Sequence, residues 1–326
     1  MRPDLSPAQP FLGPNDITRP TRARVERLSQ EMASGRTGDP GQALRGDFSD
    51  VSRLSHALQR ADADAVSLRQ AERWTGAMQA TLGRIDDAVA ALAGDLDAGL
   101  GVSTRFAADQ ARQALVDVAA LLNSPVGERS LFGNGGRTAP LPDVGAVLAD
   151  VAALAASSID LDDYAAQVDA YFAPGGPFEG TRLAAMPADP VSFPAGDGGT
   201  IELDVSARTR AVVDLLAPVA LIAGLPSAGF EVAPNSDASL DLNARLAGGR
   251  SALPALRGSV GAVEARIADR LTQIDAARTD AEMAIADRVG IDPYETASKL
   301  QHEMARLESL YAITARRSRL RLTDYL

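Results

Sequence analysis

Apolar residues recur at alternating steps of three and four along two long stretches of this chain. The first stretch covers residues 40–97, where the stripe runs from Val51 to Leu96. The second stretch occupies the last third of the chain up to residue 326 and is broken at Asp292-Pro293. Before this break its stripe comprises Val263, Ile267, Leu271 and Ile274. This period is that of a coiled-coil seam and predicts a long helix in each stretch. Because neither helix can cover its stripe alone, we expect the two to pack antiparallel.

Shorter elements are predicted between and before these stretches. A helix should begin near Thr21, after Pro20, and end by Gly35, since residues 34–41 combine three glycines with a proline and predict a turn. A further helix is predicted over residues 103–123. The rest of the middle predicts helices at 144–156, 161–172 and around 212–216, with a loop or short helix over 226–249.

The clearest strand signal lies at residues 191–205. Val191-Ser192-Phe193 and the alternating run Thr200 to Val205 flank a glycine-rich turn. Alternation of apolar and polar residues about such a turn predicts a β-hairpin with one apolar face.

Composition agrees with a mainly helical chain. Of the 326 residues 46% are hydrophobic and 4% aromatic, which favours helix-on-helix packing through small side chains over an aromatic β-core. We expect four segments: an N-terminal arm at 1–20, a helical region at 21–135, a variable middle domain at 136–250 and a second helical region at 251–326.

Charge and targeting features exclude several classes of protein. The net charge is 32 − 43 = −11, so neither nucleic acid nor an anionic membrane is expected as a partner. Cysteine is absent, which removes disulfides and thiolate sites. We expect no cleaved signal peptide in the proline-rich N-terminus and no apolar run of the roughly 18 residues that span a membrane.

Two short motifs have a superficial likeness to metal or phosphate sites. His302-Glu303 begins the His-Glu-x-x-His pattern of zinc proteases, but Arg306 stands where the second histidine is needed. Residues 133–138 are glycine-rich yet lack the Gly-Lys-Ser/Thr ending of a phosphate-binding loop. We interpret the first motif as helix surface and the second as a structural turn.

The remaining charged clusters are interpreted as surface. The pairs Asp86-Asp87 and Asp162-Asp163 point about 100° apart on a helix, unlike a catalytic pair aimed at one centre. The arginine run at 316–321 matches the preference for cations at the end of a helix, and we expect a surface or subunit-contact role for it. We therefore predict no catalytic residue, no metal and no cofactor, and a protein that is not an enzyme.

Five segments, taken in order, resemble the flagellin superfamily. Residues 28–36 are similar to the family's Leu-Ser-Ser-Gly-Lys/Arg turn, and residues 39–43 to the segment that follows it. Residues 130–134 resemble the Tyr-Leu-Phe-Ser/Gly-Gly stretch before the variable domain, and residues 291–300 the start of the C-terminal helix. Residues 318–326 resemble the ending of the hook-associated type 3 branch, which joins hook to filament, more than that of filament flagellins.

The resemblance implies a flagellin-like elongated helical bundle with a small β-containing middle domain. It implies a structural protein of the bacterial flagellum, exported by the flagellar type III apparatus to the cell exterior. The implied partners are its own subunits, the adjacent hook-associated protein, flagellin and an export chaperone. A filament flagellin subunit and a secreted coiled-coil interaction protein stay open as alternatives. Because prolines crowd the first twenty residues, the family's N-terminal helix should be shortened here or replaced by the extended arm.

The C-terminal helix carries the candidate contact residues. Its stripe spans more than one face, so we expect part of it to be buried only against neighbouring subunits or a chaperone. The candidate contact residues are Leu300, Met304, Leu307, Leu310, Tyr311, Ile313, Leu320, Leu322, Tyr325 and Leu326.

Overall fold

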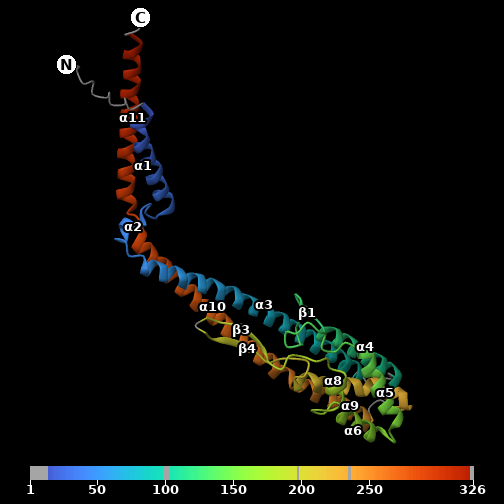
Figure 1. Ribbon diagram of the computed structural model, residues 1–326. Helices are drawn as coiled ribbons and strands as arrows, with labels where there is room; N and C mark the ends of the chain where they lie inside the picture. Colours follow the sequence, from blue (N-terminus) through green and yellow to red (C-terminus); the bar gives the residue numbers. More distant parts are fainter. Residues whose placement is uncertain (1–13, 98–102, 197, 234–235, 324–326) are drawn as a thin grey trace, which may run out of the picture. The chain divides into compact units, whose positions relative to one another are not determined.

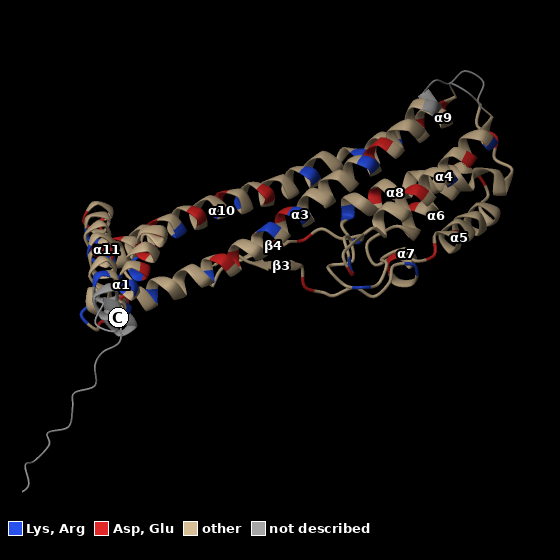
Figure 2. Cartoon of the chain, turned by 90° about the horizontal axis from the view of Figure 1, so that it is seen from above, with Lys and Arg blue, Asp and Glu red and all other residues tan. Residues whose placement is uncertain are grey.

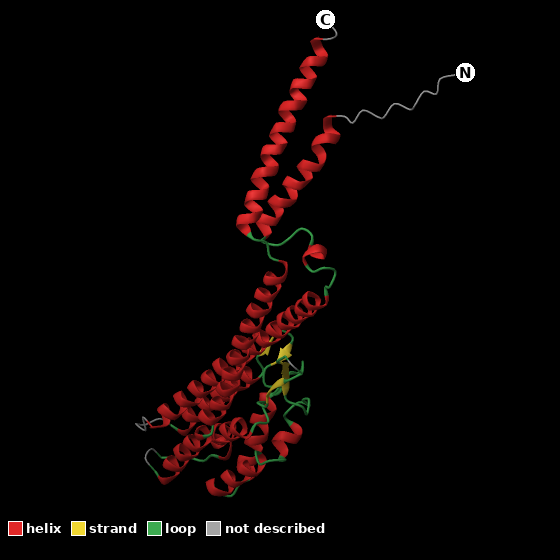
Figure 3. Cartoon of the chain, turned by 90° about the vertical axis from the view of Figure 1, so that its left-hand side faces the viewer, coloured by secondary structure: helices red, strands yellow, loops and turns green. Residues whose placement is uncertain are grey.

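A computed structural model describes residues 14–97, 103–196, 198–233 and 236–323. The described chain is mainly α-helical, with two small antiparallel sheets (Figure 3), which confirms the predicted fold class at this coarse level. The chain divides into two compact units, Met1–Ala61 with Asp275–Leu326 and Asp62–Ile274. The expected boundaries at 135/136 and 250/251 both fall inside the second unit. Each unit is described by itself.

The first unit joins helices from both ends of the sequence. Helix α1, Pro14–Ser34, lies along α11, Pro293–Thr323 (Figure 1). The unit also contains α2, Pro40–Ala43, the beginning of α3, Ser49–Asp97, and the end of α10, Leu253–Val289. In this unit Arg288 of α10 forms an ion pair with Asp50 of α3.

Helix α1 begins earlier than the sequence predicts. It starts at Pro14 instead of near Thr21, and Pro20 lies inside it. Pro20 lies in the second turn and has no N–H to donate to the helix; because Pro20 is exposed, water can reach the carbonyl that loses this donor. Residues 14–20 of the predicted arm are therefore helical, and the remainder of the arm lies outside the described residues.

The expected turn after α1 is present, but the long helix does not start at residue 40. Gly35 adopts a left-handed conformation with φ +69° at the end of α1, which glycine adopts without a Cβ penalty. After the short helix α2, Arg45 and Gly46 also have positive φ. These two residues interrupt the helix, so that α3 begins at Ser49.

The second unit is built from short elements around one apolar helix. Besides the remainder of α3 and α10, its helices are α4 Thr104–Leu122, α5 Val144–Ser157, α6 Leu161–Tyr171, α7 Pro177–Thr181, α8 Arg210–Gly224, the 3-10 helix η1 Leu225–Ala228 and α9 Asp237–Ser251. Its strands are β1 Pro125–Val126, β2 Arg129–Ser130, β3 Val191–Pro194 and β4 Thr200–Leu203. Helix α9 occupies a segment for which a loop or short helix was expected; the Gly248-Gly249 pair at its end weakened the helical signal.

Helix α8 forms the core of this unit and contacts α4, α5, α6 and α9. Together with η1 it is long and apolar enough to cross a membrane by length and composition, and 78% of that window is buried inside the unit. The prediction that no segment reaches this length was therefore wrong. Burial by four neighbouring helices accounts for its composition.

The hairpin and the long helices of the second unit pack as the sequence predicts. Strands β3 and β4 pair antiparallel, with Phe193 opposite Ile201. The Phe193 ring lies 6.4 Å from that of the buried Trp74 on α3. Gln79 of α3 donates a 2.6 Å hydrogen bond to the Arg257 carbonyl of α10. Farther along α3, Asp86 accepts a hydrogen bond from Arg250, which lies at the end of α9 just before α10. Later residues of α3 thus contact earlier residues of the opposite segment, so α3 and α10 run antiparallel.

One residue of the predicted α10 stripe is less buried than expected. Ile267 is 1% exposed, whereas Leu271 is only half-buried. The seam therefore passes through Val260, Val263, Ile267 and Ile274, and Leu271 lies on its flank.

Candidate subunit-contact surface

The motifs that had a superficial likeness to catalytic or metal sites are surface or structural features. Within the described residues no group of three or more His, Asp or Glu side chains could hold a metal ion. His56 and His302 are both exposed. The glycine-rich turn at 133–136 is held by hydrogen bonds, among them Arg129 Nε to the Gly135 carbonyl at 2.8 Å. These features agree with the structural interpretation of both motifs.

A polar hollow of about 340 Å³ lies beside α8 in the second unit. Its charged lining consists of two ion pairs, Arg210 with Asp214 and Arg245 with Asp169. Because these charges neutralise one another, the hollow has no free charge to direct at a ligand.

Helices α1 and α11 meet along a narrow and partly polar seam. Thr18, Thr21 and Leu28 of α1 and Thr296 of α11 are buried. Leu300, Leu307 and Leu310 continue the α11 side at spacings of seven and three residues, and each is half-buried. A seam of this kind covers one face of each helix and leaves the other faces open.

Polar contacts at the edge of the seam fix the antiparallel register of the two helices. The Arg22 guanidinium donates a 2.5 Å hydrogen bond to the Tyr311 hydroxyl, which raises the pKa of Arg22 above its ordinary value. Nearer the turn, Arg24 lies 3.5 Å from Glu303. The Tyr311 hydroxyl is thereby held at α1 although the residue is 43% exposed.

The structure places the candidate contact residues of α11 in three groups. Leu300, Leu307 and Leu310 line the seam, as described above. Met304, Tyr311 and Ile313 are 49%, 43% and 61% exposed. Leu320 and Leu322 lie in the last turns of α11, and Tyr325 and Leu326 lie outside the described residues.

Sequence reasoning missed one exposed apolar residue of this surface. Tyr294, in the first turn of α11, is 86% exposed. Its position next to Pro293 marks it as a helix start, and it falls outside the heptad stripe, so no periodic signal distinguished it.

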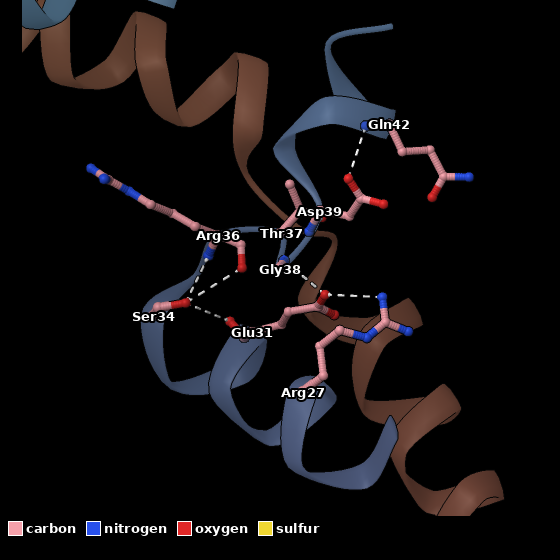
Figure 4. Close-up of polar contacts among 8 residues, drawn as sticks. All are labelled: Arg27, Glu31, Ser34, Arg36, Thr37, Gly38, Asp39 and Gln42. Carbon is pink, nitrogen blue, oxygen red and sulfur yellow. Dashed lines mark hydrogen bonds and ion pairs between the residues drawn. The ribbon is translucent and has the colours of Figure 1, made fainter. Parts of the chain in front are cut away.

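The turn between α1 and α2 is held by a buried carboxylate (Figure 4). Glu31 is 7% exposed; it accepts a 2.8 Å hydrogen bond from the Gly38 amide and pairs with Arg27 at 3.7 Å. Asp39 then caps α2 by accepting a hydrogen bond from the Gln42 amide at 3.1 Å. The polar residues of this turn therefore have structural roles.

Backbone hydrogen bonds tie this turn to the connection between α10 and α11. The Thr37 amide donates to the Val289 carbonyl at 2.9 Å, and the Ile291 amide donates to the Gly35 carbonyl at 3.1 Å. Asp292 caps α11, with Oδ1 accepting from the Tyr294 and Glu295 amides at 2.9 and 3.1 Å. The two helix connections of the first unit thus form one junction.

An apolar hollow of about 420 Å³ opens beside this junction. Its walls include Pro40, Leu44, Phe48, Val51, Leu58 and Ile285. Phe48 is 49% exposed. No sequence signal indicated the hollow, because its walls come from α2, α3 and α10 and meet only in the folded chain.

Basic and acidic residues are interspersed along the long helices α3 and α10 (Figure 2). A mixed surface of this kind does not form the one-signed field that steers nucleic acid. In the first unit, the exposed side chains of Tyr294, Met304 and Ile313 on α11 offer apolar contact instead.

Comparison with known proteins found no protein-family model that matches the chain and no curated protein similar to it in sequence.

Proposed function

We propose that this protein is a structural subunit of the bacterial flagellum that joins the hook to the filament through packing of its terminal helices. One observation carries the proposal. The first and last described helices pair with each other, and every large apolar side chain described on α11 is left at least partly exposed. Exposed apolar residues on a helix pair supply a surface for further copies of the same chain.

The sequence supports the same function. The turn at 28–43 has the order and spacing of the flagellin superfamily, and in the structure it forms the hydrogen-bonded junction between the helix connections. The resemblance of residues 318–326 to the hook-associated type 3 branch favours a junction protein over a filament flagellin. The proposed partners are its own subunits, the adjacent hook-associated protein, flagellin and an export chaperone, and the proposed location is the cell exterior.

Immunogold labelling of intact cells tests this function and separates it from the alternatives. Antibodies against the second unit should label one narrow band at the boundary between hook and filament. Labelling along the whole filament would indicate a flagellin subunit instead. Label in the medium or on the cell surface, with none on flagella, would indicate a secreted interaction protein and contradict the proposal.

A further inference from the structure

The apolar hollow beside the helix junction of the first unit has one cation on its rim. Arg36 lines the hollow and is exposed. Its guanidinium has no ion pair within the described part of the chain, and Figure 4 shows the side chain extended away from the Glu31 and Ser34 contacts. The hollow therefore combines apolar walls with one uncompensated positive charge.

The acidic groups near this rim are already engaged. Asp39 caps α2, and Asp50 forms ion pairs with Arg53 and Arg288. Asp47 accepts hydrogen bonds from the hydroxyl and amide of Ser49, which lower its pKa below the ordinary value. Arg36 is thus the charged side chain of the rim that is left open to a carboxylate from another chain.

We propose that the hollow binds the segment Asp324-Tyr325-Leu326 of a second copy of this chain. This segment places one carboxylate beside two large apolar side chains, the combination that Arg36 and the walls of the hollow would accept. Asp324 pairs with Arg36, and Tyr325 and Leu326 enter the apolar space. Charge complementarity at the rim and apolar burial inside together select this segment.

The segment cannot come from the same chain. Helix α11 begins at Pro293, next to the hollow residue Val289, and its 31 residues span about 46 Å. Three further residues reach at most about 11 Å, so the segment cannot return to the hollow of its own first unit. A contact from one end of this unit to the other end in a second copy is heterologous and can repeat along a line of copies. The inference rests on the proposed function, because it names one contact between packed subunits.

A charge-swap titration tests the contact. The probe is a peptide of residues 318–326 with a fluorescent label at its N-terminus, titrated with the full-length protein and followed by anisotropy. We expect saturable binding that Arg36→Glu weakens by about tenfold or more. The peptide with Asp324→Arg should bind the Arg36→Glu protein more tightly than it binds the wild type. The matched control is Arg60→Glu, an exposed arginine of the first unit that does not line the hollow.

Each remaining outcome has a defined meaning. Equal loss of binding in the Arg60→Glu protein, absence of saturation, or full affinity of a peptide with Tyr325→Ser and Leu326→Ser would overturn the proposal. Displacement of the probe by a peptide of residues 1–13 with higher affinity would assign the hollow to the N-terminal segment and overturn it as well. If the peptide fails to bind while immunogold label marks the hook-filament boundary, this contact alone is wrong. If the peptide binds and the label is absent from flagella, the proposed function is wrong and the self-contact stands.

Discussion

Gly290 lies at the end of α10, where no side chain can be accommodated. A Cβ there would overlap the carbonyl oxygen of Ala286, to which the Gly290 amide donates a 2.6 Å hydrogen bond. The same residue pairs with Arg36 across the helix junction. Replacing Gly290 with Ala is therefore expected to lower the free energy of unfolding by roughly 1–3 kcal/mol, measured by urea denaturation.

Gly76 is the matched control for this substitution. It is exposed in the interior of α3, and a Cβ there meets no atom within 4 Å. Gly76→Ala should therefore raise the free energy of unfolding by about 0.5–1 kcal/mol through helix propensity. Equal stability of the Gly290→Ala protein and the wild type would show that the junction is looser than described.

The acid stability of the second unit depends on Asp150. Asp150 accepts hydrogen bonds from Arg182 at 2.5 and 2.6 Å and from the Tyr171 hydroxyl at 2.7 Å. These bonds, chiefly those from Arg182, lower the pKa of Asp150 below its ordinary value of 3.8. The ionised carboxylate therefore stabilises the fold at neutral pH, and this contribution is lost as pH falls from about 4 through the lowered pKa.

The Asp150→Asn variant measures that contribution. At pH 7 it should be less stable than the wild type by about 1–2 kcal/mol, and the difference should shrink as urea denaturation is repeated below pH 4. A difference that stays constant down to pH 2 would contradict the role of the ionised carboxylate.

At the scale of elements, the pairing of α3 with α10 depends on Ile267. Its side chain is 1% exposed in the seam, whereas Leu271 is half-buried on the flank. Ile267→Asp would bury an unpaired carboxylate and should lower the free energy of unfolding by about 3–5 kcal/mol. Leu271→Asp, for which the sequence alone predicts the same loss, should cost less because water reaches the new carboxylate. Thermal melts of both variants test this order, and a more stable Ile267→Asp protein would show that the seam is misplaced.

Long periodic elements could be predicted from the sequence, and irregular ones could not. The part of the α3 stripe that lies in the second unit was correct because residues such as Leu68, Leu82 and Val89 repeat the helical period over many turns, and all three are fully buried. Helix α9 was predicted only as a loop or short helix, since its two buried leucines, Leu242 and Leu246, give only one step of the period.

The candidate contact surface, too, could be predicted from the sequence only where it follows the helical period. Periodicity identified Leu300, Leu307 and Leu310, which face the seam. Periodicity could not distinguish these three leucines from Met304 and Ile313. The single helix α1 covers only one face of α11, and the spacing of residues along α11 does not show which face that is. The apolar hollow depends wholly on tertiary packing, since Phe48 and Ile285 lie far apart in the sequence.

At the scale of the whole molecule, the end of α11 is expected to serve assembly more than folding. Deleting residues 315–326 leaves the described seam residues up to Leu310 in place. The melting temperature of the isolated protein should therefore change by less than about 2 °C, while assembly on hooks is lost. A markedly lower melting temperature would place the segment in the fold of the monomer, and full motility of the truncated strain would exclude a role in assembly.

Electron microscopy of cells that lack this protein tests its role at the hook directly. We expect completed hooks without filaments, with flagellin released into the medium, and filaments restored by the full-length protein from a plasmid. The strain carrying the chain without residues 315–326 should resemble the deletion. Cells that lack the protein and still carry filaments of normal length on their hooks would exclude a role for it in joining hook to filament.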